Sequence, residues 1–347
     1  MASNKPLPIA QIEKNYPFTI RGVKERERDW LLETNEGNMI LRLARSNEAE
    51  QLFVYSIRNH LQEKGFQGLV SMYPAKDGKL YCKVNDELFQ VAGCSKHQEI
   101  KFKNKGDLAA VVKLTAEFHQ SSQTFKAIPG SKVKTEWGRW MWTFKAYCSL
   151  GHKLGQIIKA KDRKEKAEKL FLESLEQQLE RGEACIHILK ETPYLDIVKD
   201  SMDKNELCIN NFQEKNFCKD KEQTVNIISL EDVKHDTRSV DVANLLMANS
   251  KAPERIHNIL QMYHQLYPLS SDEIKIIKAY VQFPLEYFRV VDKYYRNKKE
   301  LTDSYWLKRF KKAIDFEKTK DRFRTIDFHG VVKQCDGVMG DVQGRDC

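Results

Sequence analysis

Residues Leu207–Leu246 read LCINNFQEKNFCKDKEQTVNIISLEDVKHDTRSVDVANLL, and the rest of the chain is interpreted outward from this segment. The apolar runs Leu207–Ile209 and Val225–Leu230 predict two short buried strands joined by a polar loop. A helical pattern over Val240–Met247 follows them, with Asp241 in its first turn. We therefore expect a hairpin that leads into a helix.

The N-terminal part of the chain predicts a small β-rich lobe with one helix. Its expected elements are strands at Phe18–Val23, Trp30–Glu33, Met39–Leu43, Leu69–Tyr73 and Glu87–Ala92, and a helix from an N-cap at Ser46 to Gly65. From about Lys103 onward, apolar residues recur mostly at helical spacing. We assign residues 1–95 to the β-rich lobe, 96–325 to a helical lobe and 326–347 to a flexible tail.

The helical part carries several explicit start and stop signals. Asp107 and Thr302 are the expected N-caps of two helices. The pattern Ser270-x-x-Glu273 is a capping box, and it opens a long helix that we expect to kink at Pro284.

Leu207–Leu246 resembles the catalytic segment of kinases of the aminoglycoside phosphotransferase type, in which H-G-D-x-x-x-x-N is followed by a strand that ends in I-D. Phosphoryl transfer by such enzymes uses a cation for the phosphates, a catalytic aspartate, and an asparagine and a second aspartate for magnesium. The resemblance places these roles on Arg42, Asn211, Asn216 and Ser229 in turn, and Asp241 on the structural aspartate of the next helix. It implies an α+β, protein-kinase-like fold with two lobes.

Other motifs resemble a narrower family, the CotS-type spore coat proteins. They are LFVYSIRNHLQEKGF, AKDGKLY, AEFHQSS, KTEWGRW, YHQLYPLSSDE, FPLEYF, KYYRNKK and IDFEKTKDRF, spread over residues 15–325. The resemblance implies a structural protein of the bacterial endospore coat, made in the mother-cell cytoplasm, with other coat proteins as partners. No apolar export signal is visible near the N-terminus.

Two of the catalytic positions are neutral here, and this predicts a degenerate site. Asn211 cannot take up a proton as a carboxylate does, a function worth roughly 10²–10⁴ in rate. Ser229 is a poor ligand for Mg²⁺, which prefers carboxylate and phosphate oxygens. We therefore expect a pseudokinase-like protein that is not an enzyme, with no cofactor and no metal. The alternative is a weak phosphotransferase with Glu231 or Asp232 as the substitute metal ligand.

The β-rich lobe agrees with that expectation. The first turn contains KERER and is preceded by Gly22 alone, whereas phosphate-binding loops need several glycines. Arg42 is either the phosphate anchor or an ordinary residue on the strand surface. As an anchor, it would pair with Glu48 or Glu50 on the following helix.

Composition excludes some partners and leaves one alternative. The 58 basic and 49 acidic residues are interspersed and give a formal charge of +9. This is typical of a solvated surface, so we expect no nucleic acid partner, although a polyanion-binding module is the competing interpretation. No apolar run is long enough for a membrane span. Cys335 and Cys347 lie in the Gly-rich tail, where they would be available for intermolecular disulfides.

Overall fold

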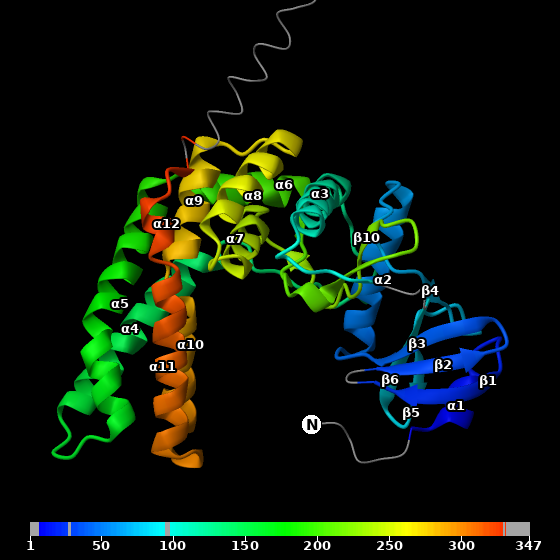
Figure 1. Ribbon diagram of the computed structural model, residues 1–347, viewed down its shortest axis with the longest axis horizontal. Helices are drawn as coiled ribbons and strands as arrows, with labels where there is room; N and C mark the ends of the chain where they lie inside the picture. Colours follow the sequence, from blue (N-terminus) through cyan, green and yellow to red (C-terminus); the bar gives the residue numbers. More distant parts are fainter. Residues whose placement is uncertain (1–6, 27–28, 94–97, 329, 331–347) are drawn as a thin grey trace, which may run out of the picture. The chain divides into compact units, whose positions relative to one another are not determined.

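The computed structural model describes residues 7–26, 29–93, 98–328 and 330. The chain divides into two compact units (Figure 1): a first unit of Met1–Lys134 with Gln213–Val233, and a second unit of Thr135–Phe212 with Lys234–Cys347. The lobe boundary at residue 95 stays a prediction. Most of the expected tail, including Cys335 and Cys347, lies outside the described residues.

The first unit is built on an antiparallel sheet. Its strands are β1 (Ile20–Glu25), β2 (Trp30–Thr34), β3 (Gly37–Leu43), β4 (Met72–Tyr73), β5 (Cys82–Val84) and β6 (Glu87–Gly93). The order is β1-β2-β3-β6-β4, and β5 also pairs with β6. The β5–β6 hairpin turns through Asn85 and Asp86, both with positive φ, as tight hairpin turns require.

The α-helices described in the first unit are α1 (Ile9–Lys14), α2 (Glu48–Glu63) and α3 (Lys105–Ser121). The N-cap of α2 is Asn47, which forms a capping box with Glu50, so the expected cap at Ser46 is one residue early. The N-cap of α3 is Asn104 rather than Asp107. The carboxylate of Asp107 instead pairs with Lys219 at 2.6 Å.

The expected hairpin between Leu207–Ile209 and Val225–Leu230 does not form, because each of these segments pairs with a different strand. In the first unit, the short 3-10 helix η1 (Glu214–Asn216) leads into β9 (Phe217–Lys219), which pairs with β10 (Val225–Ile227) and with β7 (Gln98–Glu99). In the second unit, β8 (Leu207–Cys208) pairs with β11 (Lys234–His235). The partner strands are only two or three residues long, so they leave almost no alternating pattern in the sequence.

The second unit is a set of helices around an aromatic core. They are α4 (Arg139–Lys159), α5 (Lys166–Glu191), α6 (Tyr194–Lys204), α7 (Ser239–Ala248), α8 (Pro253–Leu266), α9 (Ser271–Gln282), α10 (Leu285–Asn297), η2 (Lys298–Glu300), α11 (Asp303–Thr319) and α12 (Arg322–Thr325). Figure 1 shows α4, α5, α10 and α11 side by side. Phe144 of α4 stacks on Phe283, with ring centroids 3.6 Å apart.

Two expected helix signals have different outcomes. The capping box of Ser270 and Glu273 is present at the start of α9, as predicted. Pro284 separates α9 from α10 instead of kinking one long helix. Because proline lacks an N–H and disfavours helical geometry at the residue before it, Phe283 leaves the helix with ψ at 130°.

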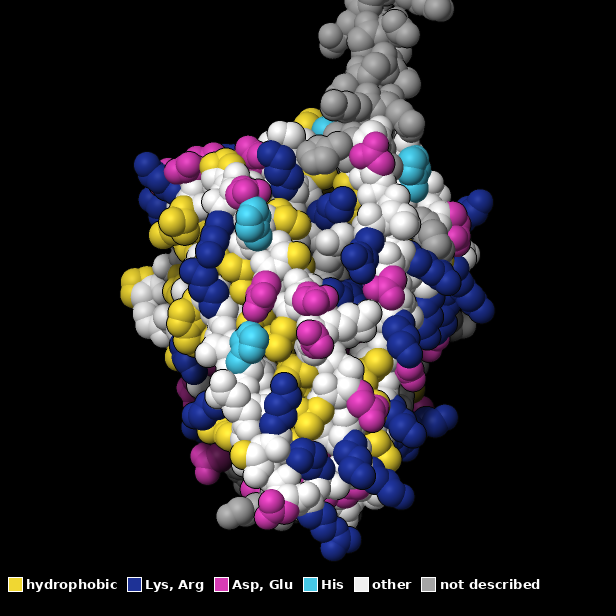
Figure 2. All heavy atoms as spheres, turned by 90° about the vertical axis from the view of Figure 1, so that its left-hand side faces the viewer, with side chains coloured by type: hydrophobic (Ala, Val, Ile, Leu, Met, Phe, Trp, Pro, Cys, Tyr) yellow, Lys and Arg dark blue, Asp and Glu magenta, His cyan; other side chains and the backbone are white. Residues whose placement is uncertain are grey.

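The described surface mixes charges of both signs. On the face in Figure 2, lysine and arginine side chains alternate with acidic ones over the helices. Within the described ranges, no helix is both long and apolar enough to cross a bilayer.

Candidate functional site

Arg42 of β3 points toward the segment that carries Ser229. Its side chain is 22% exposed, its Nη1 donates to the main-chain oxygen of Ile228 at 3.3 Å, and its Nε lies 3.8 Å from Asp29 Oδ2. Burial lowers the pKa of Arg42 from its ordinary value. A cation is thus held within the first unit beside Ile228, the residue immediately before Ser229.

The expected pairing of Arg42 with α2 is wrong. Glu48 pairs with Lys83 at 3.0 Å, and Glu50 pairs with Lys132 at 2.9 Å. The acidic partner of Arg42 is Asp29, which lies just before β2.

Asn216 ends η1 next to the same residue. It is buried, and its main-chain oxygen accepts a hydrogen bond from the N–H of Ile228 at 2.8 Å. The two positions that the resemblance gives to metal binding, Asn216 and Ser229, therefore lie on neighbouring stretches of the first unit. Ile228 links both of them to Arg42.

Glu231 has its carboxylate fully engaged by the start of α2. Its Oε1 accepts from the N–H of Arg45, from Ser46 Oγ and from Gln51 Nε2 at 2.9–3.0 Å, and its Oε2 accepts from Arg45 Nε at 3.1 Å. Asp232 Oδ2 accepts from Arg45 Nη2 at 3.0 Å. To bind a metal, Glu231 would have to give up these bonds, so they argue against it as the substitute ligand.

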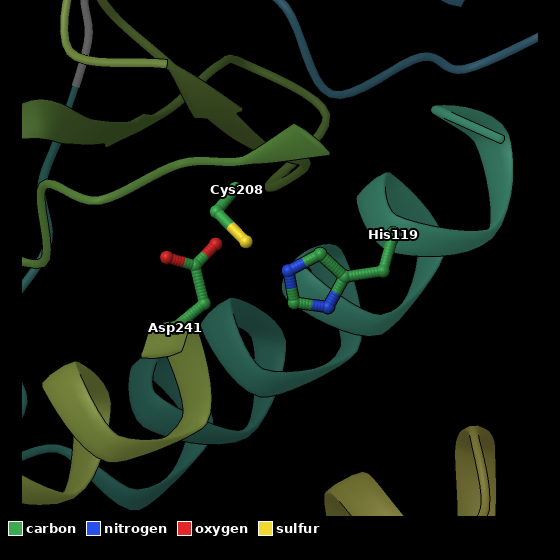
Figure 3. Close-up of side chains that lie close together, drawn as sticks. All are labelled: His119, Cys208 and Asp241. Carbon is green, nitrogen blue, oxygen red and sulfur yellow. The ribbon is translucent and has the colours of Figure 1, made fainter. Parts of the chain in front are cut away.

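Asp241 lies fully buried in the first turn of α7, in the second unit. Its carboxylate accepts hydrogen bonds from the main-chain N–H groups of Ile209 at 2.5 Å and Asn210 at 2.9 Å. Figure 3 shows this carboxylate beside Cys208 at the end of β8. Two hydrogen bonds to one buried carboxylate fix the backbone directly before Asn211.

Asn210 completes this turn. It has a left-handed backbone with φ of 60°, and its side-chain amide donates to the oxygen of Cys208 at 3.0 Å. Asparagine tolerates this conformation better than most residues, because its short amide bonds locally to the backbone. The side chain of Asn211 can orient a hydroxyl by hydrogen bonding, but it cannot accept the proton.

Sequence reasoning misses Arg45, Ser46 and Gln51 as partners of Glu231. These contacts join residues 180 to 186 positions apart in the chain, and they follow no spacing rule. The only signal near them is a helix start, which is also where anionic side chains are favoured. The first turn, with KERER, lies partly outside the described residues.

Comparisons with known proteins identify the fold and the family. Residues 9–325 match the family model described as "Spore coat putative kinase YutH". Spore coat protein S of Bacillus subtilis (strain 168) is 22% identical over 330 residues, covering 91% of this chain and 92% of that protein.

Solved structures with this fold are phosphotransferases and kinases. An aminoglycoside phosphotransferase from Alicyclobacillus acidocaldarius matches with a TM-score of 0.78 and 15% identity, over 96% of this chain and 98% of that one. AMP-bound spectinomycin phosphotransferase matches with a TM-score of 0.65 and 13% identity, over 92% of this chain and 98% of that one. The amicoumacin kinase hAmiN matches with a TM-score of 0.59 and 14% identity, over 93% of this chain and 95% of that one.

These comparisons confirm the expected kinase-like fold and the resemblance to spore coat proteins. They contradict the expectation that the chain is not an enzyme. The matching family carries the description "Spore coat putative kinase YutH", and the similar structures are phosphotransferases and kinases. Phosphoryl transfer depends mainly on positioning and electrostatics, so neutral side chains at two positions do not by themselves exclude it.

Proposed function

Because the chain belongs to the family described as "Spore coat putative kinase YutH", we propose that it is a kinase-like phosphotransferase of the spore coat. It moves a phosphoryl group from a nucleotide to a hydroxyl group of a small molecule. The observation that carries this proposal is the convergence of Arg42 and Asn216 on Ile228, next to Ser229. A partly buried cation and an asparagine that matches the kinase motif lie together there.

The chemistry assigned to each residue follows from its side chain. Arg42 supplies a permanent charge and a planar set of donors for phosphate oxygens. Asn211, held by the turn that Asp241 fixes, orients the attacking hydroxyl through its amide oxygen. Without a carboxylate at this position, the proton leaves to solvent or to phosphate. The reaction is therefore slower by about 10²–10⁴ than with a general base.

The described residues do not fit a tightly bound Mg²⁺. At the two metal positions, they provide the amide of Asn216 and the hydroxyl of Ser229, whereas Mg²⁺ is usually held by carboxylates and phosphates. The nearby carboxylate of Glu231 is taken by Arg45, Ser46 and Gln51. No step is therefore assigned to the metal, and the positive charge of Arg42 is the main contribution of this chain to phosphate binding.

The proposed place of action is the spore coat. Spore coat protein S of Bacillus subtilis, a relative of this chain, matches it over 91% of its length. We propose that the protein is made in the mother-cell cytoplasm and joins the coat through contacts with other coat proteins. A tagged copy imaged in sporulating cells should move to the spore periphery, and a uniform cytosolic signal throughout sporulation would count against this location.

A purified full-length protein tests the activity. Thermal unfolding is followed with ATP and with ADP, each with and without Mg²⁺. Binding raises the stability by RT ln(1 + [L]/Kd), about 2.7 kcal/mol at 100 Kd. We expect a shift with ATP, together with slow release or transfer of phosphate. No shift at millimolar nucleotide and no phosphate transfer would contradict the proposal.

A further inference from the structure

A pocket of about 390 Å³ lies within the first unit. One face of α2 lines it, together with the turn before β5, one residue each from β4 and β6, and the segment Ile228–Glu231. Its size is within the range of small-molecule sites. Arg42, Asn211 and Asn216 do not line it, whereas Ser229, the second of the two metal positions, does.

The pocket contains a buried cation that has no acidic partner among the described residues. Arg58 of α2 is only 6% exposed and lines the pocket. Its Nη1 donates to the main-chain oxygen of Val70 at 2.9 Å, and among the described residues no carboxylate lies within salt-bridge distance of it. Within the described part of the chain, the other four N–H donors of the guanidinium have no protein acceptor. Burial lowers the pKa of Arg58 to about 10.

A buried charge of this kind is costly unless an opposite charge neutralises it. Two acidic side chains also line the pocket, but both are engaged elsewhere. Glu231 is held by Arg45, Ser46 and Gln51. Asp77 is 54% exposed and pairs with Lys79 at 3.2 Å. Neither removes the need for an anion at Arg58.

The remaining lining is suited to an apolar body. Leu52, Met72, Leu80 and Ile228 contribute aliphatic or thioether surface, and Tyr55 and Tyr81 contribute aromatic rings. A ligand that fills this space would place apolar atoms against these side chains and a charged group at Arg58.

We propose that this pocket binds a small amphiphilic anion, a carboxylate or a phosphate monoester on an apolar body, with Arg58 as its charge partner. The inference goes beyond the proposed phosphotransfer and does not depend on it. Ile228 both lines the pocket and accepts the hydrogen bond of Arg42, so an occupant also contacts the segment that holds Arg42 in place.

The test uses matched probes and no nucleotide, so its failure is distinct from failure of the proposed activity. Binding of 4-phenylbutyrate, 4-phenylbutyl phosphate and the neutral 4-phenylbutyramide is measured by titration calorimetry on the full-length protein. Charge-assisted hydrogen bonds predict that each anion binds about 10- to 100-fold more tightly than the amide. Comparison of the two anions decides which head group the site prefers.

Substitutions of Arg58 test whether this residue causes the preference for anions over the neutral amide. Arg58→Met should remove the difference between acid and amide, whereas Arg21→Met, at an exposed position on β1, should leave it unchanged. If Arg58→Met does not fold, Arg58→Lys should keep a reduced preference for the anions. In the wild-type protein with ¹³C-methyl methionine, the signal of Met72 should shift on addition of the acid. Equal affinity for acid and amide, no binding of any probe, or an unchanged Met72 signal would overturn the proposal.

Discussion

The guanidinium of Arg42 donates a hydrogen bond to the main-chain oxygen of Ile228, 3.3 Å away and 186 residues further along the chain. The same residue, Ile228, donates its N–H to Asn216. One residue thus ties the cation of β3 to both positions that the kinase resemblance gives to metal binding. Sequence order alone would not bring these positions together.

Arg42→Met should weaken nucleotide binding by at least about tenfold, because a charge-assisted contact to phosphate is worth more than about 1.4 kcal/mol. The measurement is the thermal shift with ATP, compared with that of Arg21→Met, which carries the same change at an exposed position. Arg42→Lys should lie between wild type and Arg42→Met, because the charge remains and the planar fork is lost. Equal shifts for Arg42→Met and Arg21→Met would exclude Arg42 from phosphate binding.

Asp241→Ala should destabilise the protein by about 3–5 kcal/mol, because it leaves the buried N–H of Ile209 and the partly buried N–H of Asn210 without their charged acceptor. Asp241→Asn keeps one acceptor oxygen and should cost less. The free energy of unfolding is measured in urea. The control is Asp315→Ala on the exposed face of α11, expected within about 0.5 kcal/mol of wild type. If Asp241→Ala loses less than about 1 kcal/mol of the free energy of unfolding, the turn before Asn211 does not depend on the carboxylate of Asp241.

Glu168 predicts a specific dependence of stability on pH. Burial alone would raise its pKa, but hydrogen bonds from Lys161, Lys298 and Tyr294 outweigh burial and hold the pKa at about 2, below its ordinary 4.5. Because the folded pKa is the lower one, the stabilisation is present above about pH 4.5 and is lost as the pH falls toward 2. At neutral pH it amounts to about 3 kcal/mol.

Glu168→Gln should therefore lose about 3 kcal/mol at pH 7, and roughly half of that difference should remain at pH 3. Urea unfolding at the two pH values measures it. Glu176→Gln, exposed on the same helix, is the matched control, and its free energy of unfolding should equal that of wild type at both pH values. A wild-type minus variant difference that stays constant between pH 7 and pH 3 would show that the carboxylate is not held in its charged form.

Local signals were sufficient for much of the fold. The capping box of Ser270 and Glu273 involves residues three apart, and it opens α9 as its sequence predicts. The resemblance of Leu207–Leu246 to kinases then identified the fold class that the solved structures confirm. Both depend on patterns that are contiguous in the chain.

The contacts that shape the candidate site are not contiguous. From the sequence alone, Glu231 is a charged residue after a strand, and its carboxylate is expected to be available for metal binding. The fold gives that carboxylate to Arg45, 186 residues away, and so changes its chemistry. Arg58 is similar, because helical spacing cannot tell whether an arginine faces solvent or a pocket.

The rate of phosphoryl transfer after Asn211→Asp tests the central claim most directly. If the chain is a kinase-like enzyme slowed by a neutral residue at the catalytic position, restoring the carboxylate should raise ATP-dependent transfer by about 10²–10⁴ over wild type. Adding Ser229→Asp should increase it further by supplying a carboxylate for the metal. Asn38→Asp, at an exposed position of β3, should leave the rate unchanged. Phosphate transfer that stays undetectable in wild type and in both Asn211 variants, all of them folded, would contradict the account.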